Sequence, residues 1–163
     1  MLRPCPQSLA QKPQERNARH CGFRVDKPHS TRAESTAGKE LIRVQLGDTF
    51  WAGHLHIVCS NPAPDGSVVV FNATTPRSDS DRNCILRAGE HPSIEHESVI
   101  TYEQGRLLST AQQNQLEHSQ LFPRMRRERA SSGLIRRIQE GALKSDQTSI
   151  EIQDIIRDQI AQG

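Results

Sequence analysis

The sequence predicts a mainly β domain, a small barrel or sandwich of short strands, followed by two or three α-helices. One observation is that short apolar runs alternate with polar, turn-rich loops between residues 39 and 103. Another is that the apolar spacing becomes helical after Tyr102. Hydrophobic residues are only 34% of the 163 residues and aromatic residues 4%. The core is therefore expected to be small and concentrated.

The expected strands differ in how clearly their residues indicate them. Residues 41–46 alternate only partially and end at a Gly-Asp turn, and residues 55–59 form a short, mostly apolar run. Residues 67–72 carry β-branched side chains on both faces, as a central strand requires. Residues 84–86 and 98–102 are expected to be two further short strands.

Three segments after Tyr102 have helical apolar spacing. In the first, leucines and an alanine lie among glutamines between residues 107 and 116. The second, residues 134–143, has Ser131 or Ser132 as its cap, and Gly141 weakens its end. Ser149 can cap the last helix, in which one face carries Ile152, Ile155, Ile156 and Ile160.

Charge and composition divide the chain into three regions. Residues 1–38, with seven Lys/Arg against three Asp/Glu and several prolines, are expected to be a disordered basic N-terminal tail. Residues 39–103 are expected to form the barrel, and residues 104–163 a helical C-terminal extension. Residues 40–121 are acidic and residues 122–144 basic. A basic segment suits nucleic acid, although a solvated helix face has the same composition.

The sequence indicates a cytoplasmic protein. No apolar run is long enough to span a bilayer, and the N-terminus lacks the apolar centre of a signal peptide. The cysteines at positions 5, 21, 59 and 84 are therefore expected to be free thiols.

Several side chains between residues 47 and 102 can carry chemistry. His54 and His56 point to one face of a strand, where they could bind a metal, shuttle protons or serve only in packing. Thr74 and Thr75 follow the central strand, where hydroxyls can hold a phosphate but threonine is also common for structural reasons.

Cys84, His91 and His96 form a C-x6-H-x4-H arrangement that is chemically competent for zinc, with Cys59 as a conceivable fourth ligand. The usual C-x2-C pair is absent. We therefore expect no metal site and no cofactor. A rigid His91-Pro92 turn, with the imidazole bonded to backbone, and a buried Cys84 are the favoured alternative.

The strongest basic cluster is Arg124, Arg126, Arg127 and Arg129, which could contact phosphates. No aromatic residues are interleaved with these arginines, which argues against a base-stacking platform.

Three segments follow the order of a known family: Gly47-Asp48-Thr49-Phe50-Trp51, then residues 54–61, then residues 68–75. They resemble the MazF/PemK-type toxins, small SH3-like barrels of toxin–antitoxin systems, and the match as a whole covers about a third of the chain. In that family a Gly-Asp start and an Arg-Pro pair precede a strand ending near Ser-Asn, and a later strand ends in Thr-Ser or Thr-Thr. Residues 84–96 look like a feature of an uncharacterised bacterial branch.

The resemblance implies an SH3-like barrel and metal-independent cleavage of single-stranded RNA, with Thr74 and Thr75 at the family's hydroxyl position. This chain has Gly53-His54 where the family has Arg-Pro, and the long loop after the Gly-Asp strand is nearly deleted. His54 could replace the arginine as a general acid, because imidazole titrates near neutrality. It cannot give the bidentate grip of arginine on phosphate.

The leading hypothesis is an endoribonuclease that uses His54 as acid or base. Thr74 or Thr75 would hold the phosphate, helped by the arginines at 124, 126, 127 and 129. The alternative is a non-catalytic protein-binding module, in which the barrel and the last helix dock on a partner or form a homodimer. The expected partners are single-stranded RNA, an antitoxin or another protein, with no membrane.

Overall fold

The computed structural model describes residues 44–162. The predicted basic tail, residues 1–38, and the start of the expected strand at 41–46 lie outside the described residues, as do Cys5 and Cys21.

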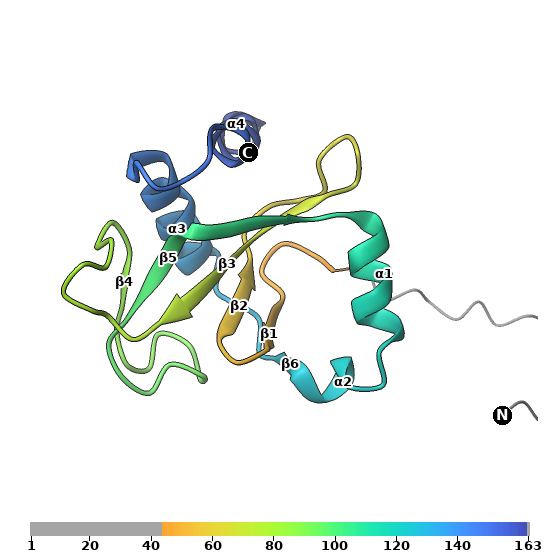
Figure 1. The fold of residues 1–163 in the computed structure, drawn as a ribbon, viewed down its shortest axis with the longest axis horizontal. Coiled ribbons are helices and arrows are strands. Elements are labelled where there is room, and N and C mark those ends of the chain that lie inside the picture. The colour runs from red at the N-terminus through yellow and green to blue at the C-terminus, as the bar shows by residue number, and fades with distance from the viewer. Residues whose placement is uncertain (1–43, 163) are drawn as a thin grey trace, which may run out of the picture. The chain divides into compact units, whose positions relative to one another are not determined.

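The centre of the fold is a curled antiparallel sheet, a half-barrel, drawn in Figure 1. Within the described residues its strand order is β4-β5-β3-β2-β1-β6. The strands are β1 (Thr49–Trp51), β2 (Leu55–Val58), β3 (Val68–Thr74), β4 (Ile85–Leu86), β5 (Ser98–Leu108) and β6 (Arg126–Arg127). The prediction of a mainly β fold followed by helices is confirmed.

Four helices accompany the sheet in the described part of the chain: α1 (Thr110–His118), α2 (Phe122–Met125), α3 (Ser132–Lys144) and α4 (Ile150–Gln162). The expected caps are present. Ser131 accepts a hydrogen bond from the Leu134 N–H, and Ser149 accepts one from the Ile152 N–H. A capping box between Ser109 and Gln112 begins α1.

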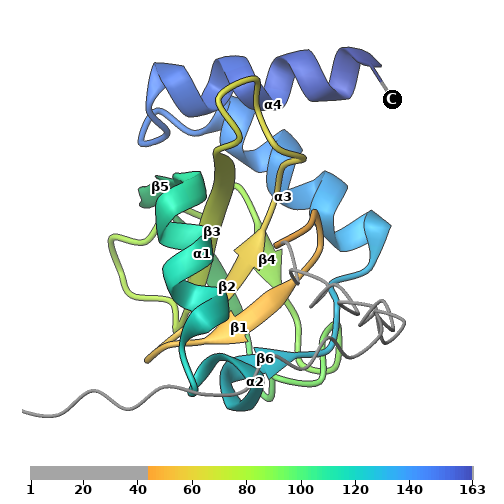
Figure 2. The same cartoon turned by 90° about the vertical axis from the view of Figure 1, so that its right-hand side faces the viewer.

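The alternation of side chains along β2 and β3 produces two apolar layers, one on each face of the sheet. On one face, Ile57, Phe71 and their neighbours pack against α3 and α4, and α4 crosses over α3 (Figure 2). On the other face, a smaller layer around Val58, Val70 and Phe122 meets α1 and α2. Because the second layer covers only part of its face, the remainder of that face is available for a site.

Three segments differ from the expected pattern. Residues 44–46 lead into a turn instead of a strand, and the chain enters the sheet at Thr49. The strand that begins at Ser98 continues to Leu108, beyond its expected end at Tyr102. Strand β6 comes from the basic segment expected to be helical, where it pairs with β1 through Thr49–Arg127 and Phe50–Arg126.

Candidate active site

A polar cavity of about 370 Å³ opens on the sheet face that α3 and α4 leave uncovered. It contains His54 from the β1–β2 turn, Thr74 from the end of β3 and Glu103 from β5. These residues are far apart in the sequence and come together because β2, β3 and β5 are neighbours in the sheet.

The tight β1–β2 turn places His54 at the cavity. Trp51 pairs with Leu55, and the Ala52 N–H donates to the His54 carbonyl at 3.0 Å. Gly53 has a φ of +78°, a conformation that a side chain rarely adopts. The turn leaves the His54 side chain exposed, where it can meet a ligand.

The two threonines that follow the central strand have different surroundings. Thr74 lines the cavity with His54. The Thr75 hydroxyl instead lies 3.2 Å from His96 Nε2. The two side chains point away from each other because residues alternate between the faces of a strand. Of the three predicted catalytic residues, the structure therefore brings His54 and Thr74 together and leaves Thr75 apart.

The floor of the cavity carries polar atoms with unused hydrogen-bonding capacity. Asn72 is 2% exposed, and its Nδ2 donates to Gln104 Oε1 at 3.2 Å. Its Oδ1, and the Thr101 Oγ1 on the neighbouring strand, have no partner among the described residues. Buried polar atoms are nearly always hydrogen-bonded, so two such atoms without a partner distinguish the floor of this cavity.

An irregularity in β5 places two further side chains at this floor. The register with β3 shifts between the Val70–Arg106 pair and the Asn72–Thr101 pair. The extra residues of β5 include Glu103 and Gln104, which both line the cavity. Bulges of this kind often redirect side chains beside functional sites.

Charges of both signs surround the cavity. Arg77 and His54 can carry positive charge, and Asp79, Asp81 and Glu103 can carry negative charge. Asp81 accepts hydrogen bonds from the Ser145 hydroxyl and from the Asn83 N–H. Arg77 and Glu103 take part in none of the ion pairs within residues 44–162, so both groups are free to meet a substrate.

His56 lies beside the cavity but is enclosed. It is 6% exposed, and its ring stacks on Phe50 with the centroids 5.0 Å apart. Burial, and next the positive charge of Arg106, lower the pKa of His56 from its usual value. His56 is therefore a neutral, packed side chain, whereas His54 is the exposed histidine of the pair.

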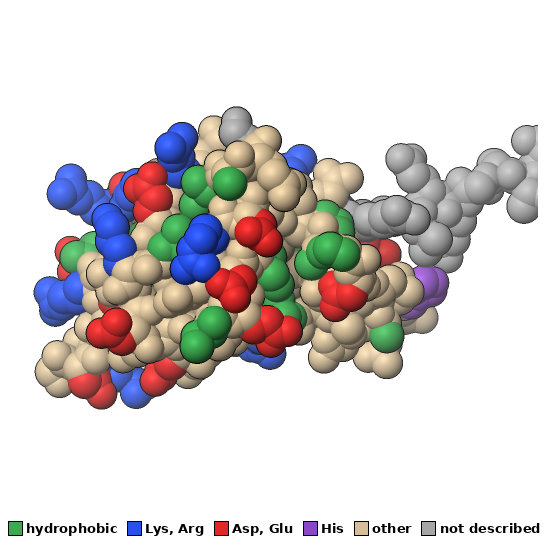
Figure 3. Space-filling view, turned by 90° about the horizontal axis from the view of Figure 1, so that it is seen from above, with side chains coloured by type: hydrophobic (Ala, Val, Ile, Leu, Met, Phe, Trp, Pro, Cys, Tyr) green, Lys and Arg blue, Asp and Glu red, His purple; other side chains and the backbone are tan. Residues whose placement is uncertain are grey.

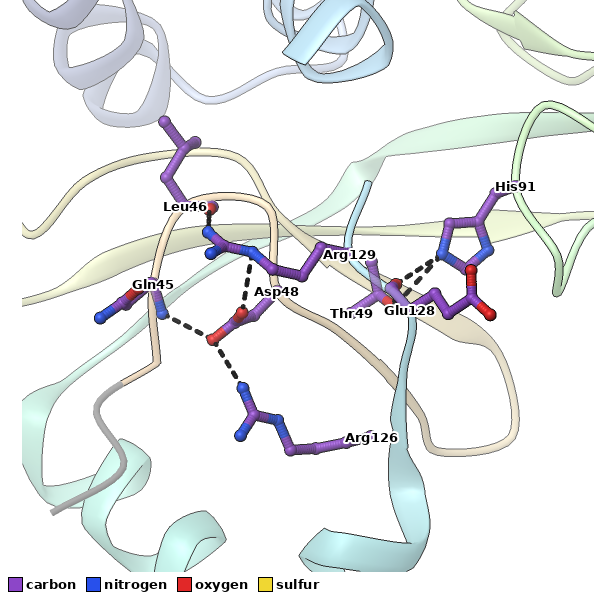
Figure 4. A network of polar contacts seen from close by, with 8 residues as sticks. All are labelled: Gln45, Leu46, Asp48, Thr49, His91, Arg126, Glu128 and Arg129. Atoms are coloured by element: carbon purple, nitrogen blue, oxygen red, sulfur yellow. Dashed lines mark hydrogen bonds and ion pairs between the residues drawn. The ribbon is translucent and has the colours of Figure 1, made fainter. Parts of the chain in front are cut away.

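The four arginines predicted to bind RNA lie around β6, and none is among the described residues that line the His54 cavity. Arg126 and Arg129 each contact the buried Asp48 carboxylate at 3.4 Å (Figure 4). The Arg127 guanidinium donates to backbone carbonyls, that of Arg124 among them at 2.8 Å. Arg126 and Arg129 therefore help to hold β6 beside β1, whereas the bonds of Arg127 stay within its own segment.

The surface itself shows no segregation of charge on the face seen in Figure 3, where acidic and basic side chains are interspersed. The division of the sequence into acidic and basic segments therefore produces no single-signed field over that face.

The alternative zinc ligands do not converge. His91 is buried, its Nδ1 accepts from the Ser93 N–H at 3.1 Å, and its Nε2 donates to the Glu128 carbonyl at 2.7 Å. His96 is exposed and lies near Thr75. No group of three or more His, Cys, Asp or Glu within residues 44–162 is placed to hold a metal ion. The expectation that His91 bonds to backbone and Cys84 is buried is confirmed.

The apolar stripe of the last helix lies largely inside the protein. Ile152 and Ile156 are 3% and 0% exposed, and Ile155 packs partly against the same core. Ile160 is 37% exposed. Two of the four residues expected to dock on a partner are therefore already covered by this chain.

Neither family models nor curated proteins match this chain. Within the described residues, no helix has both the length and the apolar character required to cross a membrane.

Proposed function

We propose that this protein is an SH3-like, MazF/PemK-like endoribonuclease that cleaves single-stranded RNA without a metal ion. The observation that carries this proposal is that His54, Thr74 and Glu103 line one cavity, above buried polar atoms that have no partner among the described residues. In this proposal the protein acts in the bacterial cytoplasm and has an antitoxin as its protein partner.

An imidazole and a carboxylate are sufficient for RNA cleavage by proton transfer. Glu103 accepts the proton of the ribose 2′-hydroxyl, whose oxygen attacks the adjacent phosphorus. The His54 imidazolium donates a proton to the departing 5′ oxygen. The phosphorus–5′ oxygen bond breaks, and the products are a 2′,3′-cyclic phosphate and a free 5′-hydroxyl.

The remaining polar side chains hold the substrate. Arg77 and the Thr74 hydroxyl are the donors in the cavity that suit phosphate oxygens. The side chains of Asn72 and Thr101 line the same cavity, beside the position proposed for the ribose or base. In this arrangement Arg77 supplies the guanidinium that the Gly53-His54 sequence lacks, and Arg124 adds affinity from outside the cavity.

The test is cleavage of a mixed-sequence, single-stranded RNA by the full chain in excess chelator. We expect the rate to fall by about 100-fold to 10,000-fold in His54→Ala and in Glu103→Gln. His96→Ala is the matched control, because His96 contacts Thr75 outside the cavity. Thr74→Val should likewise impair cleavage far more than Thr75→Val.

A substrate with a 2′-deoxy nucleotide at the cleaved position should resist the enzyme, since the attacking oxygen is missing. The proposal is wrong if the wild-type protein does not cleave RNA. It is also wrong if His54→Ala cleaves at the wild-type rate.

A second candidate is the non-catalytic protein-binding module. It is favoured by the three carboxylates of the cavity, Asp79, Asp81 and Glu103, which outnumber the single guanidinium of Arg77. This balance suits a basic peptide better than a phosphate. Binding of a lysine-rich peptide in the absence of any RNA cleavage, weakened by Glu103→Gln, would favour this candidate.

A further inference from the structure

A second, smaller cavity lies on the same face of the sheet. Its volume is about 280 Å³, near the lower end of the roughly 300–1,000 Å³ typical of ligand pockets. Phe50, Val70 and Leu108 line it from three strands, and Leu116 and Met125 close it from α1 and α2. A ligand that fills it must therefore be small and have an apolar body.

Two polar side chains face this apolar cavity. Arg106 pairs with Val70, and His56 pairs with Asn72, so both lie on the same face of the sheet on either side of β3. Arg106 is exposed and makes none of the ion pairs within residues 44–162. The cavity thus combines an apolar interior with one cation that lacks an anionic partner among the described residues.

We propose that this cavity binds a small organic anion, a carboxylate carried on an apolar chain or ring. The planar guanidinium of Arg106 matches a carboxylate through two parallel hydrogen bonds. The apolar body would replace water against Phe50, Leu108 and Met125. A phosphodiester would satisfy Arg106 but leave the apolar lining uncovered, so the observations favour the carboxylate.

His56 completes the polar end of the cavity. Its ring is fixed by stacking on Phe50 and is neutral because burial and Arg106 disfavour its charged form. A backbone hydrogen bond with Ala52 opposes these two effects and uses the single N–H of the neutral imidazole, so Arg106 is the donor for the carboxylate. This inference concerns a different cavity from the proposed cleavage site and does not depend on nuclease activity.

The experiment is calorimetric titration of the full chain with octanoate, 1-octanol and acetate. Octanoate carries both the charge and the apolar chain, octanol only the chain, and acetate only the charge. We expect octanoate to bind at least about tenfold more tightly than either of the others. The methyl resonance of Met125 should shift on addition of octanoate.

Substitutions separate the two contributions. Arg106→Gln should weaken octanoate about tenfold or more and leave octanol unchanged. The control Arg82→Gln changes an exposed arginine of another groove and should have no effect. Ala52→Leu, which adds bulk at the cavity wall, should weaken both chain-bearing ligands.

Equal affinity for octanoate and octanol, or unchanged octanoate affinity in Arg106→Gln, would overturn the assignment of an anion site. Failure of octanoate to bind at all would do the same. Thermal melting of each variant establishes that the protein tested is folded. RNA cleavage is not measured in any arm, so the result is distinct from the outcome for the proposed nuclease.

Discussion

The buried Tyr102 side chain leaves no room for a Cβ at position 141 of α3. Glycine usually weakens a helix by roughly 1 kcal/mol relative to alanine, and the sequence alone therefore suggests that α3 weakens there. The structure shows a reason for the glycine. The buried Tyr102 hydroxyl donates to the Ile138 carbonyl at 3.0 Å, and a Cβ on Gly141 would overlap that hydroxyl. Gly141 thus permits the helix to approach the sheet closely.

We predict that Gly141→Ala lowers the free energy of unfolding by about 1–3 kcal/mol, because the overlap with Tyr102 outweighs the gain in helix propensity. The matched control is Gly133→Ala in the same helix, where a Cβ would have no neighbour within 4 Å. That substitution should raise stability by up to about 1 kcal/mol. Urea unfolding measures both, and equal stabilisation by the two would contradict the packing described.

The buried His56 makes the stability of the folded protein depend on pH. Its pKa is lower in the folded protein than the ordinary value of 6.5, chiefly because the ring is buried. The unfolded chain therefore binds the proton more tightly. At a pH above the pKa that His56 has in the unfolded chain, protonation of His56 takes nothing from the free energy of unfolding. As the pH falls through that pKa toward the lower pKa of His56 in the folded protein, the free energy of unfolding decreases.

Wild-type protein should accordingly lose stability between about pH 7.5 and about pH 5, and His56→Gln should lose less over the same interval. The quantity compared is the change between the two pH values, because the substitution also alters packing. His118→Gln, at the exposed end of α1, should keep the wild-type dependence. A slope unchanged in His56→Gln would exclude His56 as its source.

Single residues of the site were only partly predictable. His54 and Thr74 could be named because imidazole and hydroxyl groups at strand ends are chemically conspicuous. Arg77, Glu103 and Gln104 could not, because an arginine, a glutamate or a glutamine is ordinary in a polar segment. Only the pairing of β5 with β3 and its shift in register bring Glu103 and Gln104 beside Asn72.

Among the elements, β6 shows most clearly what tertiary contacts add to the sequence signal. Two arginines in a basic segment have no pattern typical of a strand. They become one because Thr49 Oγ1 donates to the Glu128 carbonyl at 2.6 Å and because Asp48 holds the guanidiniums of Arg126 and Arg129. The ends of α3 and α4 could be predicted, in contrast, because serine caps and apolar spacing are local signals.

We predict that Asp48→Asn lowers the free energy of unfolding by about 1–2 kcal/mol, since the amide keeps an acceptor for the Gln45 N–H but loses the charge that attracts two guanidiniums. Asp154→Asn is the control. It removes an exposed pair with Arg157 within one helix and should cost less than about 0.5 kcal/mol. Chemical denaturation of both variants tests the difference, and similar costs would mean that Asp48 does not anchor β6.

At the scale of the whole molecule, the sheet and the last two helices form one core. Ile156 is fully buried with residues of β2, β3 and β5. We predict that Ile156→Ala costs about 2–5 kcal/mol and lowers the single melting transition of sheet and helices together. Ile160→Ala, at a position 37% exposed, should cost less than about 1 kcal/mol. Separate transitions in tryptophan fluorescence and far-ultraviolet circular dichroism would contradict a single core.

The distant pairing of the chain has a consequence for its synthesis. The Glu128 carbonyl accepts a hydrogen bond from Thr49, 79 residues away in the sequence. Asn61 and Gln159, 98 residues apart, share two hydrogen bonds. A nascent chain therefore exposes apolar surface of β2 and β3 until residues of α4, as far as Gln159, have left the ribosome. Contacts between residues so far apart slow folding and prolong the interval in which partly formed sheets can aggregate. Yield in a cell should consequently depend on chaperone capacity more strongly than the small size of this domain suggests.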